Sequence, residues 1–258
     1  MKKPENLKEI NRSFELQAAG FESRSLNFTK EDYLKKTVDI VAPTKKMVML
    51  EVAAGTCAVS RSFAPHVKMA VCLDATEAML HVGRAEADKN GLSNMVFVKG
   101  YAEELPFLSD SFDIVISRLA FHHFTDTTAV FDEMVRVCRQ GGRVVMIDML
   151  APEEELRGIR DRIETMRDPS HERNLSKAEM MRLFEDRGLS IEVDDVTPMP
   201  MMLENWLELT KTPEDDRTRI YTLMDAEIDG GERTGFYPYR TDEGICFDHQ
   251  WELIIGRL

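Results

Sequence analysis

The stretch V-M-L-E-V-A-A-G-T-C-A-V-S, residues 48–60, followed by V-C-L-D at residues 71–74, decides the fold of this chain. Each part holds an apolar strand that ends at a carboxylate, Glu51 in the first and Asp74 in the second. Small residues follow the first strand, so a ligand can approach the backbone closely, and Gly55 can take a positive φ at little cost. In α/β folds, a carboxylate ending the second strand about 20 residues on binds ribose hydroxyls. The pattern therefore predicts an α/β fold that binds a nucleoside-bearing cofactor.

The details of the turn choose among such cofactors. The dinucleotide fingerprint G-x-G-x-x-G brings a helix N-terminus to a pyrophosphate. Here the residues at spacing two are Ala53, Gly55 and Cys57, and no glycine follows in the third place. The chain also lacks the G-x-x-x-x-G-K-[ST] motif of nucleoside triphosphate sites. Glu51 would repel a phosphate but suits an ammonium. S-adenosylmethionine (SAM) has an ammonium, a sulfonium and a ribose but no phosphate, so the charges favour SAM.

Seven segments along the chain carry a resemblance to a known family. They are F-E-L-Q-A-A-G-F (14–21), L-E-V-A-A-G-T-C (50–57), C-L-D-A-T-E-A-M-L (72–80), Y-A-E-E-L-P-F (101–107), S-F-D-I-V-I-S-R-L-A-F-H-H-F (111–124), G-G-R-V-V-M-I-D (141–148) and R-D-P-S-H (167–171). With these segments in order, the chain resembles class I SAM-dependent methyltransferases. It is similar to their ubiquinone/menaquinone C-methyltransferase-like (methyltransferase type 11) group. Cys57 stands where the family usually has glycine, and Tyr101 stands where an acidic residue often meets the adenine amino group.

The resemblance implies an α/β, Rossmann-like sheet of seven strands, mostly parallel with the last strand antiparallel, and helices on both faces. The residue patterns agree with it. Short apolar runs at 47–52, 68–73, 95–99, 112–117 and 143–148 are typical of buried parallel strands, and 190–197 and 246–256 are two expected final strands. Helix starts are marked by Thr76, by Asp126, and by the capping box of Ser176 with Glu179.

The cofactor is expected at the carboxyl ends of these strands. The candidate cofactor-binding residues are Glu51, Ala53, Ala54, Gly55, Asp74, Ala75, Met79, Tyr101, Ala102, Glu103 and Arg118. Asp74 would hold the ribose, Met79 would pack on adenine, and a backbone N–H at Ala102 or Glu103 would meet the adenine edge. Blander interpretations stay open: Asp74 as a helix cap, Met79 as a core residue and Glu103 as a solvated charge.

Three histidines, His123, His122 and His171, are candidates for a catalytic base, in no firm order. His122 and His123 follow the fourth strand, and neighbouring side chains on an extended backbone point to opposite faces. We therefore expect only one of them to face substrate, and together they make a poor metal pair, so no metal site is predicted. His171 lies in a predicted loop, because Pro169 disfavours helix at Asp168. The alternative for the pair is a structural histidine bonded to the lid.

Two segments, 1–46 and 199–245, exceed what the sheet needs. Helix starts are marked in them by Thr29 with Asp32 and by Thr212 with Pro213. Both are expected over the carboxyl edge of the sheet, where ligands bind in open α/β folds. We predict that both segments form a helical lid over the substrate. We also predict that the whole chain, 1–258, is a single domain.

Composition limits the partners. The net charge is −13 without a Lys/Arg-rich run, so DNA and RNA are not expected partners. The four cysteines lack C-x-x-C spacing, which argues against zinc or a disulfide framework. The first ten residues hold no apolar segment, and nothing reaches the ~18 apolar residues of a membrane span. We expect a soluble, cytoplasmic protein, and a homodimer is compatible with the sequence.

The expected activity is methyl transfer from SAM to a small-molecule acceptor by in-line displacement, with S-adenosylhomocysteine as product. Alignment of the reactants can lower the barrier by roughly 7–11 kcal/mol, and a closed lid keeps water out. A phenol, enol or ring-carbon acceptor would need a base, whereas a thiolate or a deprotonated amine would not. The alternative is a SAM-binding protein that transfers another group from a SAM derivative or acts as a ligand-controlled regulator, since fold does not decide function.

Overall fold

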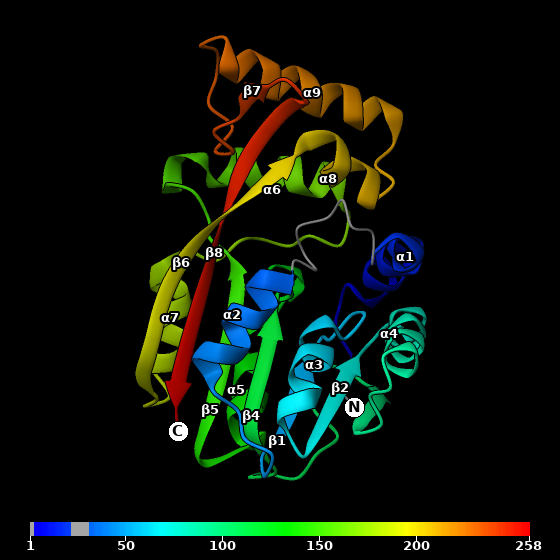
Figure 1. The fold of residues 1–258 in the computed structure, drawn as a ribbon. Helices are drawn as coiled ribbons and strands as arrows, with labels where there is room; N and C mark the ends of the chain where they lie inside the picture. The colour runs from blue at the N-terminus through cyan, green and yellow to red at the C-terminus, as the bar shows by residue number, and fades with distance from the viewer. Residues whose placement is uncertain (1–2, 22–30) are drawn as a thin grey trace.

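The computed structural model describes residues 3–21 and 31–258. Within them, seven strands form one sheet in the order β3-β2-β1-β4-β5-β8-β6 (Figure 1). These are β1 Val48–Val52, β2 Met69–Asp74, β3 Met95–Lys99, β4 Phe112–Arg118, β5 Cys138–Met149, β6 Ser190–Met202 and β8 Gly244–Arg257. Strands β1 to β5 pair in parallel, and β8 runs antiparallel to β5 and β6. The predicted Rossmann-like sheet is confirmed. A short additional strand, β7 Tyr239–Thr241, pairs with β8 away from this path.

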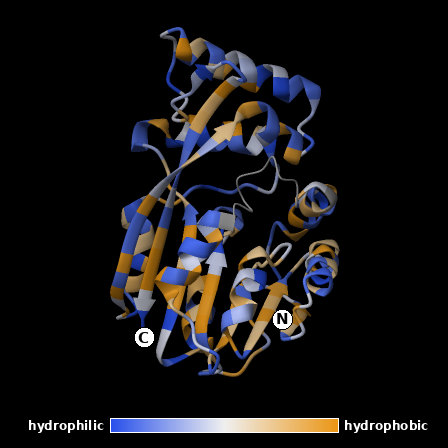
Figure 2. Cartoon of the chain, in the orientation of Figure 1, coloured by the Kyte–Doolittle hydropathy of each residue, from blue (hydrophilic) through white to orange (hydrophobic). Residues whose placement is uncertain are grey.

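The central strands are buried on both faces, which is why they are almost wholly apolar (Figure 2). Alternate residues serve different cores: Ile114 packs into the cluster on one face and Val115 into the cluster on the other. Helices α2 Glu31–Val41, α3 Ala58–Phe63 and α4 Glu77–Lys89 cover the first face, and α5 Thr127–Val137 and α7 Lys177–Glu185 cover the second.

Two of the predicted helix caps have the expected bonds. Asp126 accepts a hydrogen bond from the Ala129 N–H (2.9 Å), and Ser176 with Glu179 completes both bonds of the capping box. The prediction for Pro213 is wrong by one position. Pro213 is the N-cap of α9 Glu214–Ile228, because the preceding Thr212 bonds outside the helix, through its hydroxyl to the Arg167 carbonyl (3.3 Å).

A cap stands over the carboxyl ends of the parallel strands (Figure 1). It consists of α6 Glu154–Arg167, α8 Leu203–Leu209, α9, β7 and the ends of β6 and β8, which extend beyond the rest of the sheet. The core of one sheet face continues into the cap, through Trp251 to Trp206 and Phe236. The cap is therefore built on the sheet's own core.

The two predicted lid segments have unequal roles in this arrangement. Helix α1 Leu7–Gln17 contacts α4 and lies near the strand ends, whereas α2 packs on the sheet face beside α3. The capping pair predicted at Thr29 and Asp32 involves residue 29, outside the described residues. The second segment begins later than expected, since β6 continues to Met202, and α6 was not anticipated as part of the cap.

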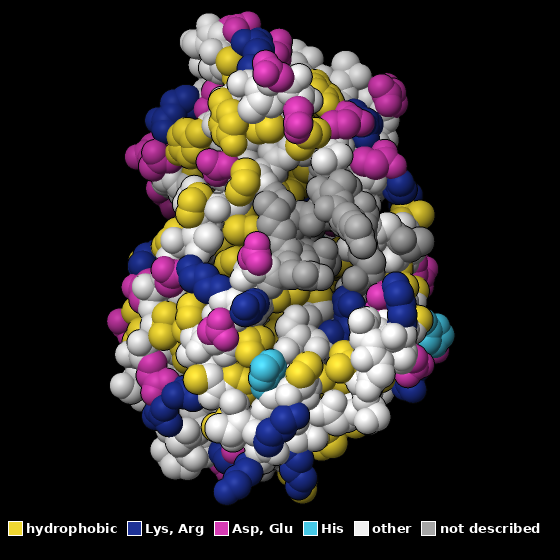
Figure 3. All heavy atoms as spheres, in the orientation of Figure 1, with side chains coloured by type: hydrophobic (Ala, Val, Ile, Leu, Met, Phe, Trp, Pro, Cys, Tyr) yellow, Lys and Arg dark blue, Asp and Glu magenta, His cyan; other side chains and the backbone are white. Residues whose placement is uncertain are grey.

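Side chains of both charge signs are spread over the face of the molecule in Figure 3, with ion pairs such as Lys36–Asp195 (2.8 Å) among the residues described. No helix within the described residues is long and apolar enough to cross a membrane.

Candidate active site

One cavity lies between the strand ends and the cap. All eleven predicted cofactor-binding residues line it, and so do His122 and His123. The topology brings them together because the ends of β3, β2, β1 and β4 lie side by side in the sheet. The binding roles of these residues remain predictions, but their common location is a fact of the structure.

The turn after β1 has an unusual backbone. Ala53, Gly55 and Cys57 all have left-handed φ angles, of 53°, 52° and 60°. The turn is fixed by the Ala54 N–H, which donates to the Leu73 carbonyl (2.9 Å), and by the Cys57 N–H, which donates to the Ala54 carbonyl (2.7 Å). Cys57 is the N-cap of α3 in this conformation. A left-handed cap explains why the family prefers glycine there, since only glycine adopts it without strain.

Glu51 lies buried at the base of this turn, 3% exposed. Its Oε2 accepts a hydrogen bond from the Ser60 N–H (2.8 Å) at α3. Burial raises the pKa of Glu51 to about 7, although the Ser60 hydrogen bonds and the charges of Arg118 and Arg61 act in the opposite direction. A buried carboxylate whose charge is this costly would gain from a cationic ligand.

Asp74, at the end of β2, connects two turns. Its Oδ2 accepts from the Gly55 N–H and its Oδ1 accepts from the Thr76 N–H, both at 2.7 Å. Burial raises the pKa of Asp74 to about 6 despite these bonds. The N-cap of α4 is Thr76, so the interpretation of Asp74 as the helix cap is wrong; Asp74 instead accepts a hydrogen bond from the N–H of the N-cap residue. Each carboxylate oxygen has a second lone pair, so this bond leaves Asp74 able to accept from ribose hydroxyls as well.

The expectation that His122 and His123 point to opposite faces is wrong. After β4 the chain bends at Leu119 (φ 52°) and forms a short 3₁₀ helix, Phe121–His123. On this helical turn the two rings lie 4.1 Å apart, centroid to centroid, and both line the cavity. The alternation of side chains along β4 ends with the strand at Arg118, so it does not apply to His122 and His123.

His122 forms a buried pair with Asp148 at the end of β5. The Nδ1 of His122 lies 2.6 Å from Oδ1 of Asp148, whose Oδ1 also accepts from the Met149 N–H (2.7 Å). Burial would lower the pKa of His122, but the charge and hydrogen bond of Asp148 outweigh it and raise the pKa above its ordinary value. The pair holds Nδ1, so Nε2 is the ring nitrogen available to a ligand.

His123 differs in its electrostatics. Its Nδ1 lies 3.0 Å from the Ser170 carbonyl oxygen, so it donates there, and its ring meets Phe14 of α1 edge-on at 5.1 Å. Burial and the neighbouring His122 lower the pKa of His123 to about 3. His123 is therefore neutral near pH 7 and a much weaker base than His122.

His171 does not line the cavity. It is buried behind His122, with ring centroids 5.7 Å apart, and its Nε2 lies 3.0 Å from Oδ1 of Asp161 on α6. It joins the loop after α6 to that helix. Of the three candidate histidines, His122 and His123 line the cavity, and His171 packs behind His122 without lining it.

Comparison with known proteins fits this geometry. A family profile described as a methyltransferase domain matches residues 50–146. The uncharacterized methyltransferase YcgJ of Bacillus subtilis is 33% identical over 187 residues, covering 72% of this chain and 74% of YcgJ. The YcgJ crystal structure aligns with a TM-score of 0.80 at 30% identity, over 88% of this chain and 97% of that chain. This chain belongs to the SAM-dependent methyltransferases.

Two further proteins are similar to this chain, one in sequence and one in fold. The ubiquinone/menaquinone biosynthesis C-methyltransferase UbiE of Shewanella frigidimarina is 31% identical over 126 residues, 47% of this chain and 50% of UbiE. A Haemonchus contortus phosphoethanolamine N-methyltransferase, solved with S-adenosylhomocysteine, shares the fold with a TM-score of 0.63 at 15% identity, over 96% of this chain and 57% of that chain. SAM is the cofactor of this methyltransferase, as the charges of the turn predicted.

The two lid segments were expected over the substrate, and α1 and α8 do line the far end of the cavity, but the individual residues that line this end were not predicted from the sequence. That end is lined by Gln17 of α1, by Met149 at the end of β5, by Asp168 after α6, and by the cap residues Arg167, Trp206, Leu209 and His249. Two features of the sequence could have pointed to this part of the structure. Asp148 is a carboxylate that closes an apolar strand, like Glu51 and Asp74, and His249 interrupts the apolar alternation of β8 yet is fully buried.

Proposed function

We propose that this methyltransferase transfers the methyl group of SAM to a small-molecule acceptor held between His122 and the cap. The observation that carries the proposal is a single cavity lined at one end by Glu51 and Asp74 and at the other by residues of the cap. A cavity roofed by its own cap suits a small acceptor better than a macromolecule.

The residues around the turn fit the cofactor. Glu51 would bind the ammonium, because its buried carboxylate gains most from a cation, and Arg118 at the end of β4 would face the carboxylate of SAM. Asp74 would hold the ribose hydroxyls. Adenine would lie between Met79 and the segment after β3, where Tyr101, Ala102 and Glu103 line the cavity.

When bound, SAM supplies a methyl group on a good leaving group, so the chain mainly positions the acceptor in line with it. Correct alignment can account for roughly 7–11 kcal/mol of barrier. His122, held by Asp148, would accept a proton from a phenol, enol or ring-carbon acceptor at Nε2. His123, neutral and bonded to Ser170, would form the wall beside it.

The cap and α1 must admit the acceptor and then exclude water. We propose that α1 and the segment 203–245 act as the lid. Hydrogen exchange with and without S-adenosylhomocysteine tests this: both segments should exchange more slowly when ligand is bound. Slowing confined to the strand ends would contradict a lid.

An untargeted metabolite screen with methyl-labelled SAM tests the function. Label should appear in a small molecule together with equimolar S-adenosylhomocysteine. Tight SAM binding without S-adenosylhomocysteine formation from any acceptor would instead support the alternative, a SAM-binding protein that does not transfer methyl groups.

A further inference from the structure

The cap end of the cavity contains buried polar groups that lack partners. Trp206 and His249 line the cavity and are fully buried. Among the described residues, the indole Nε1 of Trp206 and both ring nitrogens of His249 have no hydrogen-bond partner. Buried polar groups in native proteins are nearly always satisfied, and an exception calls for an explanation such as a ligand.

Helix α6 brings charge to the same place. Arg160, Glu164 and Arg167 follow one another on successive turns, and all three are buried. Glu164 lies 3.9 Å from Arg160 (Oε1 to Nη2) and 3.6 Å from Arg167 (Oε2 to Nη1). Two guanidinium groups share one carboxylate, so this triad carries an excess positive charge.

The arginines are held by aromatic rings and carbonyls. Arg167 lies over the Trp206 ring at 4.4 Å and donates from Nε to the Trp206 carbonyl (3.0 Å), which fixes a guanidinium that also lines the cavity. Arg160 lies over Phe236 at 4.1 Å. Burial, and next the charges of Arg160 and Arg167, lower the pKa of His249 far below its ordinary value, so its ring is neutral.

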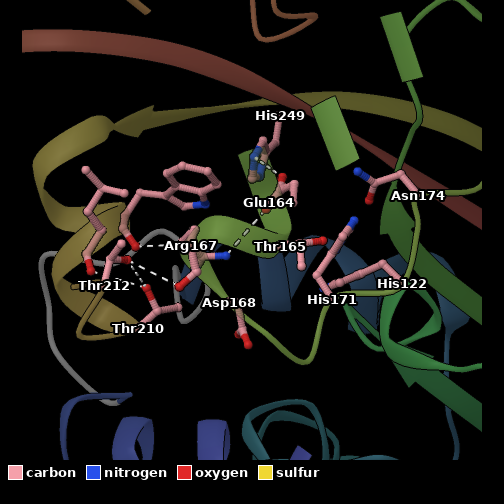
Figure 4. Close-up of polar contacts among 12 residues, drawn as sticks. His122, Glu164, Thr165, Arg167, Asp168, His171, Asn174, Thr210, Thr212 and His249 are labelled. Atoms are coloured by element: carbon pink, nitrogen blue, oxygen red, sulfur yellow. Dashed lines mark hydrogen bonds and ion pairs between the residues drawn. The ribbon is translucent and has the colours of Figure 1, made fainter. Parts of the chain in front are cut away.

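Two carboxylates lie near this end, those of Glu164 and Asp168, and the charges of both act on Arg167. Glu164 Oε1 lies 3.8 Å from His249 Nε2, too far for a hydrogen bond (Figure 4). Asp168 points away from Glu164 and His249 (Figure 4). Its oxygens accept from Gln17 Nε2 (2.9 Å) and from the Ser170 hydroxyl (2.7 Å).

We propose that Arg167, His249 and Trp206 form a subsite for a carboxylate of the methyl acceptor, an inference that rests on the proposed function. The indole N–H of Trp206 and the one N–H of the neutral His249 ring lack acceptors and lie near the Arg167 guanidinium, and a carboxylate offers two acceptor oxygens to such a set. Leu119, Met149 and Leu209 line the cavity nearby and give it apolar walls. The acceptor is therefore an apolar, flat or compact molecule with one carboxylate away from the methylated atom.

The experiment compares matched probes on the protein saturated with S-adenosylhomocysteine. Benzoate and benzamide form one pair, and phenylacetate and phenylacetamide form another; each is titrated by calorimetry. A hydrogen-bonded charged group should make each carboxylate bind about tenfold to a hundredfold more tightly than its amide. Equal affinity within each pair would overturn the proposal.

Variants locate the effect. Arg167→Gln should abolish the preference for the carboxylate while S-adenosylhomocysteine still binds. Arg162→Gln, the same change at an exposed position of the same helix, should keep the preference. Should Arg167→Gln not fold, His249→Phe, which continues the apolar stripe of β8, should reduce the preference about threefold to tenfold. A preference that survives in the variants at 167 and 249 would overturn the subsite.

The controls separate this proposal from the function itself. Failure of S-adenosylhomocysteine to bind wild-type protein would contradict the proposed function. Binding of S-adenosylhomocysteine, with methyl transfer to an uncharged acceptor and no preference for benzoate over benzamide, would contradict the carboxylate subsite alone.

Discussion

The two ends of the cavity are built in different ways. The proposed cofactor end comes from the ends of four adjacent strands, β3, β2, β1 and β4, and the turns that follow them, and its residues fall between Glu51 and Arg118. The proposed acceptor end is assembled from α1, the end of α6, α8 and β8, so Gln17 and His249, which lie far apart in the sequence, line one cavity. Local turn geometry defines the first end, and long-range packing defines the second. Variants at the first end should therefore mainly change cofactor affinity, and variants at the second end should mainly change acceptor binding.

The largest effect is expected at the junction of the two ends. His122→Asn should lower kcat by ~10²–10⁴-fold with an acceptor that must lose a proton, because the ring nitrogen opposite Asp148 is lost. S-adenosylhomocysteine affinity should change less than about threefold. Steady-state kinetics and calorimetry measure the two quantities.

His123→Asn serves as the matched control. The low pKa of His123 makes it a poor base, so its replacement should cost much less turnover than that of His122. Equal losses in the two variants would mean that the ring pair acts through packing.

At the cofactor end, Asp74→Ala should weaken SAM binding by about 1.5–3 kcal/mol, the range for hydrogen bonds to a charged group. Turnover at saturating SAM should change little by comparison, which separates this end from His122. Calorimetric titration with a thermal melt checks the prediction. Unchanged affinity with a large loss of stability would mean that Asp74 only holds the two turns together through its bonds to Gly55 and Thr76.

The difference between the two ends of the cavity also explains how much of the fold and of the site could be predicted from the sequence. Glu51, the turn after β1 and Asp74 follow one another within 24 residues, so their spacing alone was enough to predict a nucleoside-binding site. The sheet order follows from strands that alternate with helices. The orientation of His122 and His123 could not be predicted in this way, because the periodicity of β4 carries no information about the bend at Leu119.

The residues that meet at the proposed acceptor end could not be predicted from the sequence, and the reason is physical. Arg167 and Trp206 lie far from β8 in sequence and meet His249 only because β6 and β8 extend past the sheet into the cap. A period-two pattern marks His249 as inward-facing, but nothing local shows that it faces a guanidinium pair. Only the packed cap shows that.

A smaller effect concerns pH. The pKa of Glu51, raised by burial to about 7, means that the ligand-free protein holds a proton there below pH 7. An ammonium requires the ionised form, so affinity for S-adenosylhomocysteine should fall about tenfold from pH 8 to pH 6. In the ligand-free protein the same shift makes Glu51 cost stability as pH rises toward 7.

Glu51→Gln tests this assignment. The variant should bind more weakly at pH 8 and should lose most of the pH dependence in calorimetric titrations. A wild-type profile that stays flat between pH 6 and 8, or one that Glu51→Gln leaves unaltered, would show that Glu51 does not meet the ammonium.

The smallest effect is expected at Cys57, where this chain departs from the glycine usual in the family. Cys57→Gly relieves a left-handed φ of 60°, which costs an L-residue about 1–2 kcal/mol. It also removes a fully buried thiol and adds glycine's flexibility in the unfolded chain, which together cost a similar amount. The free energy of unfolding should therefore change by less than about 1 kcal/mol in urea titrations, with SAM affinity unaltered.

Gly55→Ala is the matched control, in which backbone strain is added and not removed. The added methyl would have room, since the nearest atom is Met79 Cε at 3.6 Å, but alanine would be strained at the left-handed φ of residue 55. A loss above about 3 kcal/mol in Cys57→Gly would show that the thiol, in its cluster with Ala54, Cys72 and Leu80, contributes more to the cofactor end than backbone geometry does.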